Sequence, residues 1–416
     1  MVSPAPPDLP ATPRSFLFLQ GPLGPFFRRL GRRLRGRGHR VLRVNFNGGD
    51  LYDWPCRGVV NYRGTADDWP GFVTDLAARN EVTDIVLIGD CRPLHVAAVE
   101  ALRAWRPSIR VHVFEEGYIR PDWITLEADG VNARSNLPRD PAVIAAVPEG
   151  NLPPRFGVPV GQSTFRMGLR AMISYFAMFL LTPLFRHYVH HRPDMPSREA
   201  RLWFRRLLGR EARKTRALAQ EEELLASGRP YFLLLLQLNV DKQIVNHSPY
   251  KSMRDYMAAV MRSFADHAPA DAHLVVKAHP LDNGRDDHGG DLAALAAETG
   301  LDGRVMLIDG GNLFALLGGC RAAVTVNSTA GISALHRSVP LIALGNAIFN
   351  IAGLCHQGGL DSFWTEPSPV DAGLYHAWRN MVAYRTQVNG NFYVERGIWI
   401  AIEGSLPILE GAPEAA

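Results

Sequence analysis

The sequence has few cysteines and no pattern that would pair them or bind a metal. Four cysteines are scattered over the 416 residues without a Cys-x-x-Cys spacing: Cys56, Cys91, Cys320 and Cys355. This arrangement argues against a disulfide-stabilised secreted scaffold and against a cysteine zinc site. No Asp-x-Asp pair or spaced histidine cluster offers another metal site. The sequence therefore predicts a protein of the reducing cytosol that works without a metal and without a cofactor.

Hydrophobic runs long enough to cross a membrane are also missing. The longest uncharged apolar stretch, residues 171–185, contains Pro183 and falls short of the roughly 18–20 residues that a membrane-spanning helix needs. Residues 1–13 are rich in proline and lack the apolar segment of a signal peptide, so we expect a disordered lead and no export. The 171–185 segment either lies on a membrane surface or forms a buried interdomain helix.

Several common catalytic motifs are absent. We find no Walker lysine loop, no Gly-x-Gly-x-x-Gly after the first apolar run, no Gly-x-Ser-x-Gly and no His-Glu-x-x-His, which disfavours the enzyme classes that depend on these motifs. Gly21 and Gly24 form a lone glycine pair after that run. A glycine pair at this position suits close approach of the backbone to a ligand or acceptor.

Acidic residues are missing between Asp8 and Asp50, although the net charge is only +4. Eight arginines gather in this region: Arg28, Arg29, Arg32, Arg33, Arg35, Arg37, Arg40 and Arg43. A solvated helix face and a patch that meets anionic lipid headgroups explain them equally well. Nucleic acid is disfavoured as a partner, because no aromatic side chains interleave with the arginines.

What the sequence does contain is a repeated alternation of short apolar runs with helical patterns, typical of parallel sheets covered by helices on both faces. The runs lie at 16–19, 41–46, 84–88 and 111–114, and again at 231–236, 274–276, 305–308, 322–326 and 341–344. We therefore predict an α/β protein of GT-B architecture, with two Rossmann-like domains and a ligand cleft between them. The expected parts are a lead (1–13), an N-terminal domain (14–150), a helical connector that can face a membrane (151–227), a C-terminal domain (228–370) and a helical tail returning to the first domain (371–416).

Carboxylates follow two of the apolar runs. Glu115 and Glu116 end the 111–114 run, and Gln237 and Asp241 follow the 231–236 run. Neighbouring residues at a strand end point in opposite directions, so we expect one of the two glutamates to face the substrate and act as a general base. Carboxylates from two domains suit a retaining double displacement with Asp241 as the nucleophile. The alternatives are an acidic turn paired with Arg120 and a helix cap at Asp241.

Two further strand ends carry groups that bind anions. Lys277, His279 and Pro280 close the 274–276 run, and the sequence Asn327-Ser328-Thr329 closes the 322–326 run just before a predicted helix. Cationic side chains, hydroxyls and the N–H groups of a helix start can converge on a phosphate. Each group alone is equally consistent with a structural histidine or a simple helix cap.

Taken together, these motifs resemble the capsule polysaccharide proteins of the KpsS/LipB type, which are related to KpsC. The resemblance rests on FLFLQGPLGPFF, FEEGYIRPDWITLE, QLNVD, KAHPLDN and VNSTAG and covers most of the chain. It implies a β-Kdo glycosyltransferase that uses CMP-Kdo and builds the Kdo linker of a capsule on phosphatidylglycerol. It also implies a cytoplasmic protein on the inner membrane, with a KpsC-like transferase and the capsule export machinery as partners.

The resemblance implies a role for each motif. His279, Pro280, Ser328 and Thr329 match elements that hold CMP, Glu115 matches the base, and Asp241 matches an aspartate nucleophile. This chain departs from KpsC-like chains just before that aspartate: it has Gln-Leu-Asn-Val-Asp where they have Gln-Val-Glu-Asp-Asp, so Asp241 keeps one acid without its acidic neighbours. We expect Arg120 to hold the sugar carboxylate by a bidentate contact. Two alternatives stay open: a non-catalytic assembly or export component, and transfer of another CMP-activated acid such as sialic acid.

Overall fold

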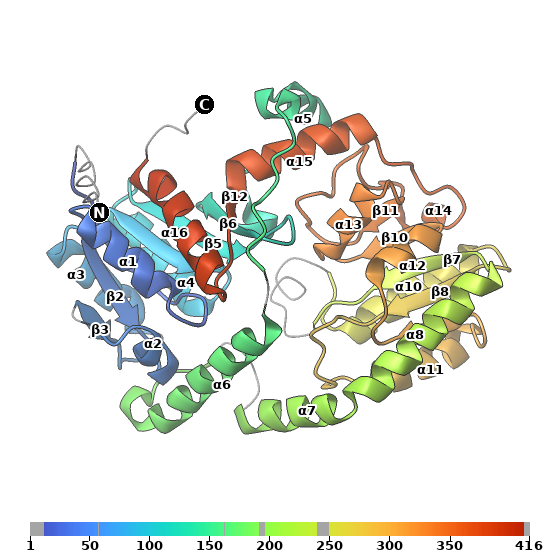
Figure 1. The fold of residues 1–416 in the computed structure, drawn as a ribbon, viewed down its shortest axis with the longest axis horizontal. Helices are drawn as coiled ribbons and strands as arrows, with labels where there is room; N and C mark the ends of the chain where they lie inside the picture. Colours follow the sequence, from blue (N-terminus) through green and yellow to red (C-terminus); the bar gives the residue numbers. More distant parts are fainter. Residues whose placement is uncertain (1–11, 57, 162, 191–195, 239–248, 412–416) are drawn as a thin grey trace, which may run out of the picture. The chain divides into compact units, whose positions relative to one another are not determined.

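The computed structural model describes residues 12–56, 58–161, 163–190, 196–238 and 249–411 (Figure 1). The chain forms two compact units. The first comprises Met1–Asn136, Arg155–His191 and Val382–Ala416, and the second comprises Leu137–Pro154 and Arg192–Met381. Residues 1–11 of the predicted lead lie outside the described residues.

These units differ from the predicted segments at three places. Residues 137–150, predicted in the first domain, belong to the second unit, where the Asn380 side chain donates to the Leu152 carbonyl 2.8 Å away. The predicted connector 151–227 is divided between the units, and the tail joins the first unit at Val382 rather than at 371. The chain therefore passes between the units more often than composition indicated, because contacts distant in sequence decide where each segment packs.

The first unit is built on a seven-stranded sheet in the order β12-β6-β5-β4-β1-β2-β3. Strands β1 to β5 are parallel, while β6 runs antiparallel to β5 and β12 antiparallel to β6. The bounds are β1 (Ser15–Phe18), β2 (Arg40–Asn45), β3 (Val59–Asn61), β4 (Asp84–Ile88), β5 (Arg110–Glu116), β6 (Trp123–Ala128) and β12 (Gln387–Asn389). Its helices are α1 (Phe26–Gly36), α2 (Gly48–Asp53), α3 (Trp69–Arg79), α4 (Pro93–Trp105), α6 (Thr164–Leu180) and α16 (Glu395–Glu410).

Strand β1 shows why this sheet is covered on both faces. Successive side chains of a strand point to opposite faces. Phe16 and Phe18 pack into a cluster with residues of α1 and α16. Leu17 and Leu19 pack into a second cluster with residues of α3 and α4. The uninterrupted apolar run of β1 is thus a consequence of burial between two helical layers.

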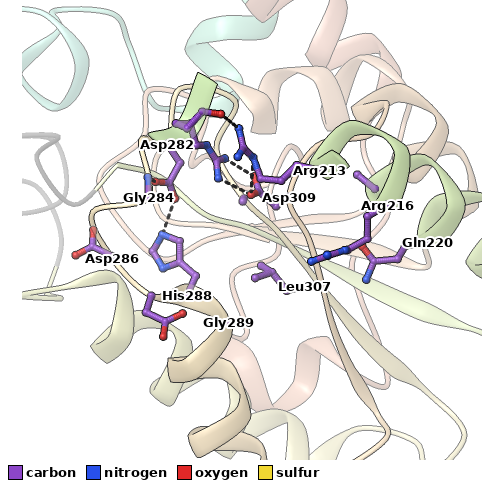
Figure 2. Close-up of a pocket in the computed structure, with 14 residues that line it drawn as sticks. Arg213, Arg216, Gln220, Asp282, Gly284, Asp286, His288, Gly289, Leu307 and Asp309 are labelled. Atoms are coloured by element: carbon purple, nitrogen blue, oxygen red, sulfur yellow. Dashed lines mark hydrogen bonds and ion pairs between the residues drawn. The ribbon is translucent and has the colours of Figure 1, made fainter. Parts of the chain in front are cut away.

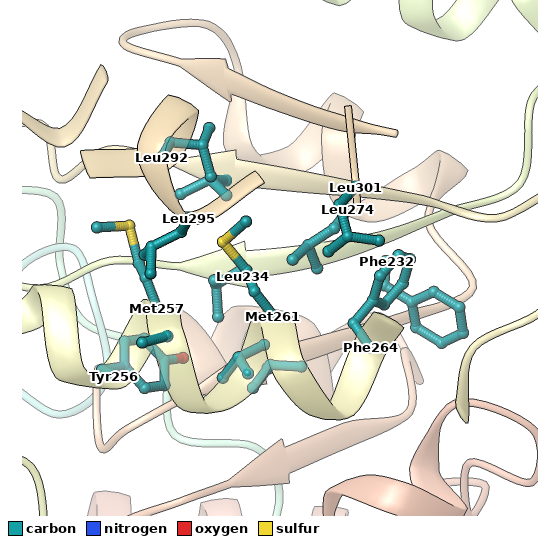
Figure 3. Close-up of a cluster of buried hydrophobic side chains, with 14 of the residues drawn as sticks. Phe232, Leu234, Tyr256, Met257, Met261, Phe264, Leu274, Leu292, Leu295 and Leu301 are labelled. Atoms are coloured by element: carbon teal, nitrogen blue, oxygen red, sulfur yellow. The ribbon is translucent and has the colours of Figure 1, made fainter. Parts of the chain in front are cut away.

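The second unit is built on a five-stranded, fully parallel sheet in the order β11-β10-β7-β8-β9. The bounds are β7 (Tyr231–Leu235), β8 (His273–Lys277), β9 (Val305–Ile308), β10 (Ala322–Thr325) and β11 (Leu341–Ala343). Helices described in this unit include α5 (Pro141–Ala146), α7 (Pro196–Leu208), α8 (Arg210–Ser227), α10 (Met253–His267), α11 (His288–Thr299), α12 (Leu313–Gly319), α13 (Ala330–His336) and α14 (Gly359–Phe363), with α15 (Ala372–Thr386) reaching into the first unit. Figure 3 shows α10 placing Met257, Met261 and Phe264 against the sheet residues Phe232 and Leu234.

Both sheets have the same strand order when the parallel strands are counted along each unit: 3-2-1-4-5. This is the order of a Rossmann fold, and it reverses direction between the first and fourth strands. Ligands of such sheets bind outside the carboxyl ends of the strands at this switch point. The predicted α/β class with two Rossmann-like halves is confirmed, and the switch points lie between β1 and β4 and between β7 and β10.

The basic patch on α1 is largely neutralised within the first unit. Arg29 pairs with Glu395, Arg33 with Glu403 at 2.8 Å, and Arg37 with Glu410 at 2.6 Å. Arg29 and Arg33 lie one turn apart on α1 and Arg37 is its C-terminal cap, so the three follow one face of the helix and meet acidic residues along α16. Arg43, also in the predicted patch, is buried beside Asp50 at 3.1 Å. Within this unit the structure thus gives four of the eight arginines acidic partners, and the choice between a solvated face and a headgroup patch stays a prediction.

Helix α6 packs closely on the short helix α2 of the same unit. A Cβ added to Gly48 would lie 2.2 Å from the Ala177 carbonyl oxygen, and one added to Gly49 would lie 2.9 Å from that of Ser174. Only glycine permits such an approach of two backbones. The contact places the Ser174 hydroxyl 3.3 Å from Asp53 Oδ2, which also accepts from the Gly24 N–H at 3.0 Å.

We expect Asp53→Asn to stabilise the protein at neutral pH. Burial is the main cause that raises the pKa of Asp53 from 3.8 to about 6, with the nearby Asp50 adding to it. A raised pKa in the folded state means that the protonated carboxyl favours folding. This contribution to stability is complete below about pH 4 and is lost as the pH rises through about 6. Asparagine keeps an acceptor for Gly24 without the charge. Urea unfolding should show a gain of about 1–2 kcal/mol in the free energy of unfolding at pH 7.5. This is less than the full pKa shift would correspond to, because Asp53 is partly solvated.

The same measurement at pH 5 provides the internal control for Asp53→Asn. The gain should shrink there, because the wild-type carboxyl is then largely protonated. Asp67→Asn, at an exposed position ahead of α3, should change the free energy of unfolding at neither pH. An equal effect of Asp53→Asn at both pH values would contradict the assigned cause.

Candidate functional site

Two polar side chains meet across the switch point of the first unit. Gln20 follows β1 and Arg92 follows β4, and the Arg92 guanidinium donates to Gln20 Oε1 at 3.4 Å. The Gln20 amide donates in turn to Asp50 Oδ2 at 3.1 Å and to the Tyr188 hydroxyl at 3.3 Å. This network places donors and a carboxylate at the sheet edge where the Rossmann order predicts a ligand.

Sequence reasoning missed Gln20 and Arg92. Gln20 lies within the FLFLQGPLGPFF motif, but no role was assigned to it, and no motif contains Arg92; the available signal is that each follows an apolar strand within a few residues. The neighbouring glycines were predicted, and the structure gives both a local reason. A Cβ on Gly21 would lie 2.5 Å from the Phe27 ring, and Gly24 has a φ of +105° with Arg170 closing the space beside it. Both glycines thus have a packing role in this unit.

Glu115 and Glu116 end β5, beside β4, and point to different neighbours. A Cβ on Gly89, which directly follows β4, would lie 3.4 Å from Glu115 Oε2, so Glu115 extends toward the switch point. Glu116 Oε1 instead accepts from the Tyr393 hydroxyl at 3.0 Å. Burial, followed by the charge of Glu116, raises the pKa of Tyr393 well above its ordinary value, so this phenol stays a donor. The two carboxylates therefore have different environments.

The loop after β5 brings Arg120 to the same edge of the sheet. Gly117 permits the turn, because a Cβ there would lie 2.3 Å from the Trp123 carbonyl oxygen. The exposed Arg120 side chain donates through Nε to the Gly117 carbonyl at 3.2 Å. Its charge also acts on Tyr393, where it opposes the rise in pKa. Arg120, Glu116 and Tyr393 therefore form one polar group beside Glu115.

In the second unit, Gln237 and Asn327 bridge the switch point directly. The Gln237 amide donates to Asn327 Oδ1 at 2.9 Å, and the Asn327 backbone N–H donates to Gln237 Oε1 at 3.0 Å. This reciprocal pair ties the end of β7 to the end of β10, although the two residues are 90 positions apart. Gln237 is buried, so we assign it to holding the Asn327-Ser328-Thr329 turn in place.

The turn after β10 keeps hydroxyl groups at the sheet edge. Ser328 Oγ accepts from the Ala330 N–H at 3.2 Å, and its hydrogen stays available for donation. Thr329 is the cap residue of α13, but its hydroxyl makes no cap hydrogen bond. Helix α13 is only seven residues long, so its dipole is a small part of any anion binding here and the hydroxyls and backbone N–H groups are the main donors.

His279 and Lys277 close β8 but face different surroundings. His279 Nδ1 accepts from the Leu281 N–H at 3.1 Å, which indicates a neutral ring with its proton on Nε2. Pro280 follows in an exposed turn. Lys277 is buried, and its Nζ donates to the Ala278 carbonyl at 3.2 Å. Burial lowers the pKa of Lys277, and the charges of Asp309 and Glu221 oppose that shift by stabilising its charged form.

A pocket of about 470 Å³ lies on that side of the second unit. Figure 2 shows Arg213, Arg216 and Gln220 of α8 approaching it from one side, and Asp282 and His288 from the other. Arg206 of α7 binds Asp309 in bidentate fashion, and His288 Nε2 lies 3.0 Å from Asp282 Oδ2. The ion pairs shape the pocket wall just beyond the end of β8.

The structure therefore brings the predicted residues into two separate groups. Glu115, Glu116 and Arg120 share the carboxyl edge of the first sheet; Gln237, Lys277, His279, Pro280, Asn327, Ser328 and Thr329 share that of the second. Asp241, the predicted nucleophile, lies outside the described residues, so its role stays a prediction. Among the ranges described, no three His, Cys, Asp or Glu side chains are grouped to hold a metal ion.

Comparison with known proteins relates the chain to capsule biosynthesis. A family model described as capsule polysaccharide biosynthesis protein matches residues 83–393. The capsule polysaccharide export protein KpsS of Escherichia coli is 37% identical over 381 residues, which cover 91% of this chain and 97% of that protein. The capsule polysaccharide modification protein LipB of Neisseria meningitidis serogroup A is 35% identical over 390 residues, 91% of each chain.

A solved structure, the β-Kdo 2,7 transferase of KpsC from Thermosulfurimonas dismutans, aligns with 94% of this chain and 99% of its own, at 13% identity and a TM-score of 0.46. The family match spans well over half of the chain, and both curated relatives align over nearly their whole length. The chain belongs to the capsule polysaccharide biosynthesis protein family.

Proposed function

We propose that this protein is a retaining β-Kdo glycosyltransferase that transfers Kdo from CMP-Kdo to a (lyso)phosphatidylglycerol acceptor. This reaction starts the poly-Kdo linker of a capsular polysaccharide. Membership of the capsule biosynthesis family and the motifs shared with the KpsS/LipB type support the proposal. One structural observation carries it: carboxylates stand at the carboxyl edge of one Rossmann-type sheet, and hydroxyl and imidazole groups, which can donate to a phosphate, stand at that of the other.

The first unit supplies the acid/base chemistry in this proposal. Glu115 extends toward the switch point while Glu116 is held by Tyr393, so we assign Glu115 as the general base that takes the proton of the acceptor hydroxyl. Glu116 positions Tyr393 and the loop. Arg120 binds the carboxylate of the sugar. The nucleophile comes from the predicted C-terminal domain: Asp241 forms the covalent glycosyl intermediate that retention of configuration requires.

The second unit holds the nucleotide in this proposal. The neutral His279 donates from Nε2 to the phosphate of CMP, and Ser328 and Thr329 donate their hydroxyls. Gln237 holds the Asn327 turn in place through its reciprocal hydrogen bonds with Asn327. In this mechanism these donors bind the monophosphate, and the leaving group needs no metal ion. Lys277 adds a buried positive charge behind these donors.

The lipid acceptor requires contact with a membrane, and α6 offers an apolar surface for it. Met172, Phe176, Phe179 and Leu180 are 62–65% exposed and recur at helical spacing on the side away from Ser174. The described part of the chain has no helix long and apolar enough to traverse a bilayer. We therefore propose peripheral binding on the cytoplasmic face of the inner membrane, with α6 inserted shallowly. A KpsC-like transferase and the export machinery would act on the product.

A second candidate function is a non-catalytic assembly component, which the name of the relative from E. coli, an export protein, favours. Purified full-length protein with CMP-Kdo and a fluorescent lysophosphatidylglycerol separates the two: mass spectrometry should detect a product heavier by one or more Kdo residues. CMP-sialic acid serves as the donor control. Product only with CMP-sialic acid would redefine the donor, and no product with either donor would favour the assembly role.

We expect His279→Ala to weaken binding of CMP by about tenfold, the loss of one hydrogen bond to a charged group. Isothermal titration calorimetry measures this directly. His273→Ala is a matched control, because His273 lies at the opposite, amino end of the same strand. Equal affinities of the wild type and His279→Ala would remove this histidine from the proposed nucleotide site.

A further inference from the structure

Helix α7 of the second unit presents its apolar face to solvent. Trp203, Phe204, Leu207 and Leu208 are 43%, 62%, 64% and 72% exposed. Their spacing places them on one side of the helix. A surface helix ordinarily turns this side toward the protein core. The inverted orientation requires an explanation beyond the packing of this unit.

The opposite side of α7 explains the orientation. Arg206 forms a bidentate ion pair with Asp309 after β9, and the Arg213 guanidinium of α8 donates to the Arg206 carbonyl. Arg213 Nε also lies 3.7 Å from Asp309. These polar contacts hold the charged side of the helix against the unit, so Phe204 and Leu208 necessarily point outward.

Basic side chains accompany the apolar face. Arg201 and Arg205 are exposed and lie three residues before Phe204 and Leu208, which makes them neighbours on the helix surface. The segment 196–216 contains two acidic residues and eight basic ones: Arg198, Arg201, Arg205, Arg206, Arg210, Arg213, Lys214 and Arg216. An apolar stripe with an indole and a strong positive charge is the pattern of a helix that lies in a lipid headgroup region.

We propose that α7 is a membrane-binding element that inserts Trp203, Phe204, Leu207 and Leu208 into an anionic lipid surface while Arg201 and Arg205 contact its headgroups. This deepens the proposed function by naming its lipid-binding surface in the second unit. The surface and the pocket that Arg206 lines are on opposite sides of one helix, about 10–12 Å across. Lipid binding by α7 therefore holds that pocket close to the headgroup plane.

A second copy of the chain is a poorer occupant of this face. Four side chains of this size offer roughly 400–500 Å² of apolar surface, about half of the 800 Å² per partner typical of stable interfaces. A symmetric dimer through α7 would also bring the arginines of both copies together. Anionic lipid satisfies the apolar side chains and the positive charge at once.

The first test is sedimentation of the full-length protein with vesicles of phosphatidylcholine alone or with added phosphatidylglycerol. Wild type should bind the anionic vesicles, and the triple change F204S/L207S/L208S should weaken this binding by at least about tenfold. R201Q/R205Q should weaken it by about tenfold, with less effect at high salt. The matched control L218S/L225S changes exposed leucines of α8 and should leave binding unchanged.

A label on α7 provides an independent readout. An environment-sensitive fluorophore on L207C, in a C56S background that removes the exposed native cysteine, should shift to the blue on anionic vesicles only. A label that is already blue-shifted without vesicles would show that the chain itself covers the face and would overturn the proposal. Wild-type binding that is independent of anionic lipid, or unchanged in the triple variant, would overturn it as well.

Two further measurements separate the remaining outcomes. A dimer in light scattering that the triple variant dissociates would assign the face to a second copy and overturn the lipid proposal. Transfer of Kdo to a lysolipid dispersed in detergent needs the catalytic groups but no vesicle surface. The triple variant should retain this transfer, so loss of vesicle binding with retained transfer supports α7, whereas vesicle binding without any transfer in the wild type would contradict only the proposed function.

Discussion

Replacing Glu115 by glutamine is expected to lower the rate of sugar transfer by about 10²–10⁴-fold, the contribution of a positioned general base. Glu115 extends over Gly89 toward the switch point of the first sheet, and glutamine preserves its size while removing its basicity. The affinity for CMP should stay within about twofold, because the proposed nucleotide ligands lie in the second unit. Single-turnover transfer from CMP-Kdo measures the rate, and calorimetry measures the affinity.

Glu116→Gln is the matched control for this experiment. Its amide oxygen can still accept from the Tyr393 hydroxyl, which lies 3.0 Å from Glu116 Oε1, so we expect less than about a tenfold loss. Circular dichroism should confirm that both variants are folded. A larger loss in Glu116→Gln than in Glu115→Gln would reverse the assignment, and an unchanged rate in both variants would exclude the pair as the base.

Asp50→Ala is expected to destabilise the first unit by about 3–5 kcal/mol, the cost of leaving a buried charge without its partner. Arg43 is 3% exposed and lies 3.1 Å from Asp50. Burial is the main cause that lowers the pKa of Arg43, and the charge of Asp50 is the main one that opposes it. Asp50 also accepts from the Gln20 amide and from the Phe46 N–H at 3.0 Å, so the variant loses several contacts at once.

Urea unfolding with hydrogen exchange on β1 and β2 measures this effect in the first unit. The control is Asp75→Ala, which removes the partner of Arg79 from an ion pair whose side chains are 72% and 76% exposed. Pairs of this kind contribute about 0–1 kcal/mol. A loss below about 1 kcal/mol for Asp50→Ala would show that Arg43 finds another partner or is solvated in the folded unit.

The strand pattern could be predicted from the sequence because burial on both faces of a parallel sheet selects continuous apolar runs. The runs at 84–88, 274–276 and 305–308 all correspond to strands of the structure. β6 and β12 were not predicted. β12 is three residues long, and its pairing with β6 joins Gln387 to Thr125 across more than 260 residues. No local sequence pattern predicts a pairing between segments so far apart in the chain.

The charge pattern was less informative than the strand pattern. Sequence alone left the arginines of α1 open between a solvated face and a headgroup patch. The structure shows Arg29, Arg33 and Arg37 paired with α16, more than 360 residues away along the chain. The structure also exposes the apolar side of α7 to solvent, which the charge pattern did not indicate. A charge in a sequence indicates a need for a partner, and only the folded chain shows which partner is within reach.

The sequence by itself determined the α/β class, the family motifs and the strand ends that carry polar residues, because these depend on local periodicity and on residue type. Only the tertiary structure decided that Glu115 and Glu116 have different neighbours, that Gln237 holds Asn327 across a switch point, and that Arg43 is buried with Asp50. Such contacts form between elements that are adjacent in a sheet but distant in the chain. Their geometry follows from strand order, which no single segment encodes.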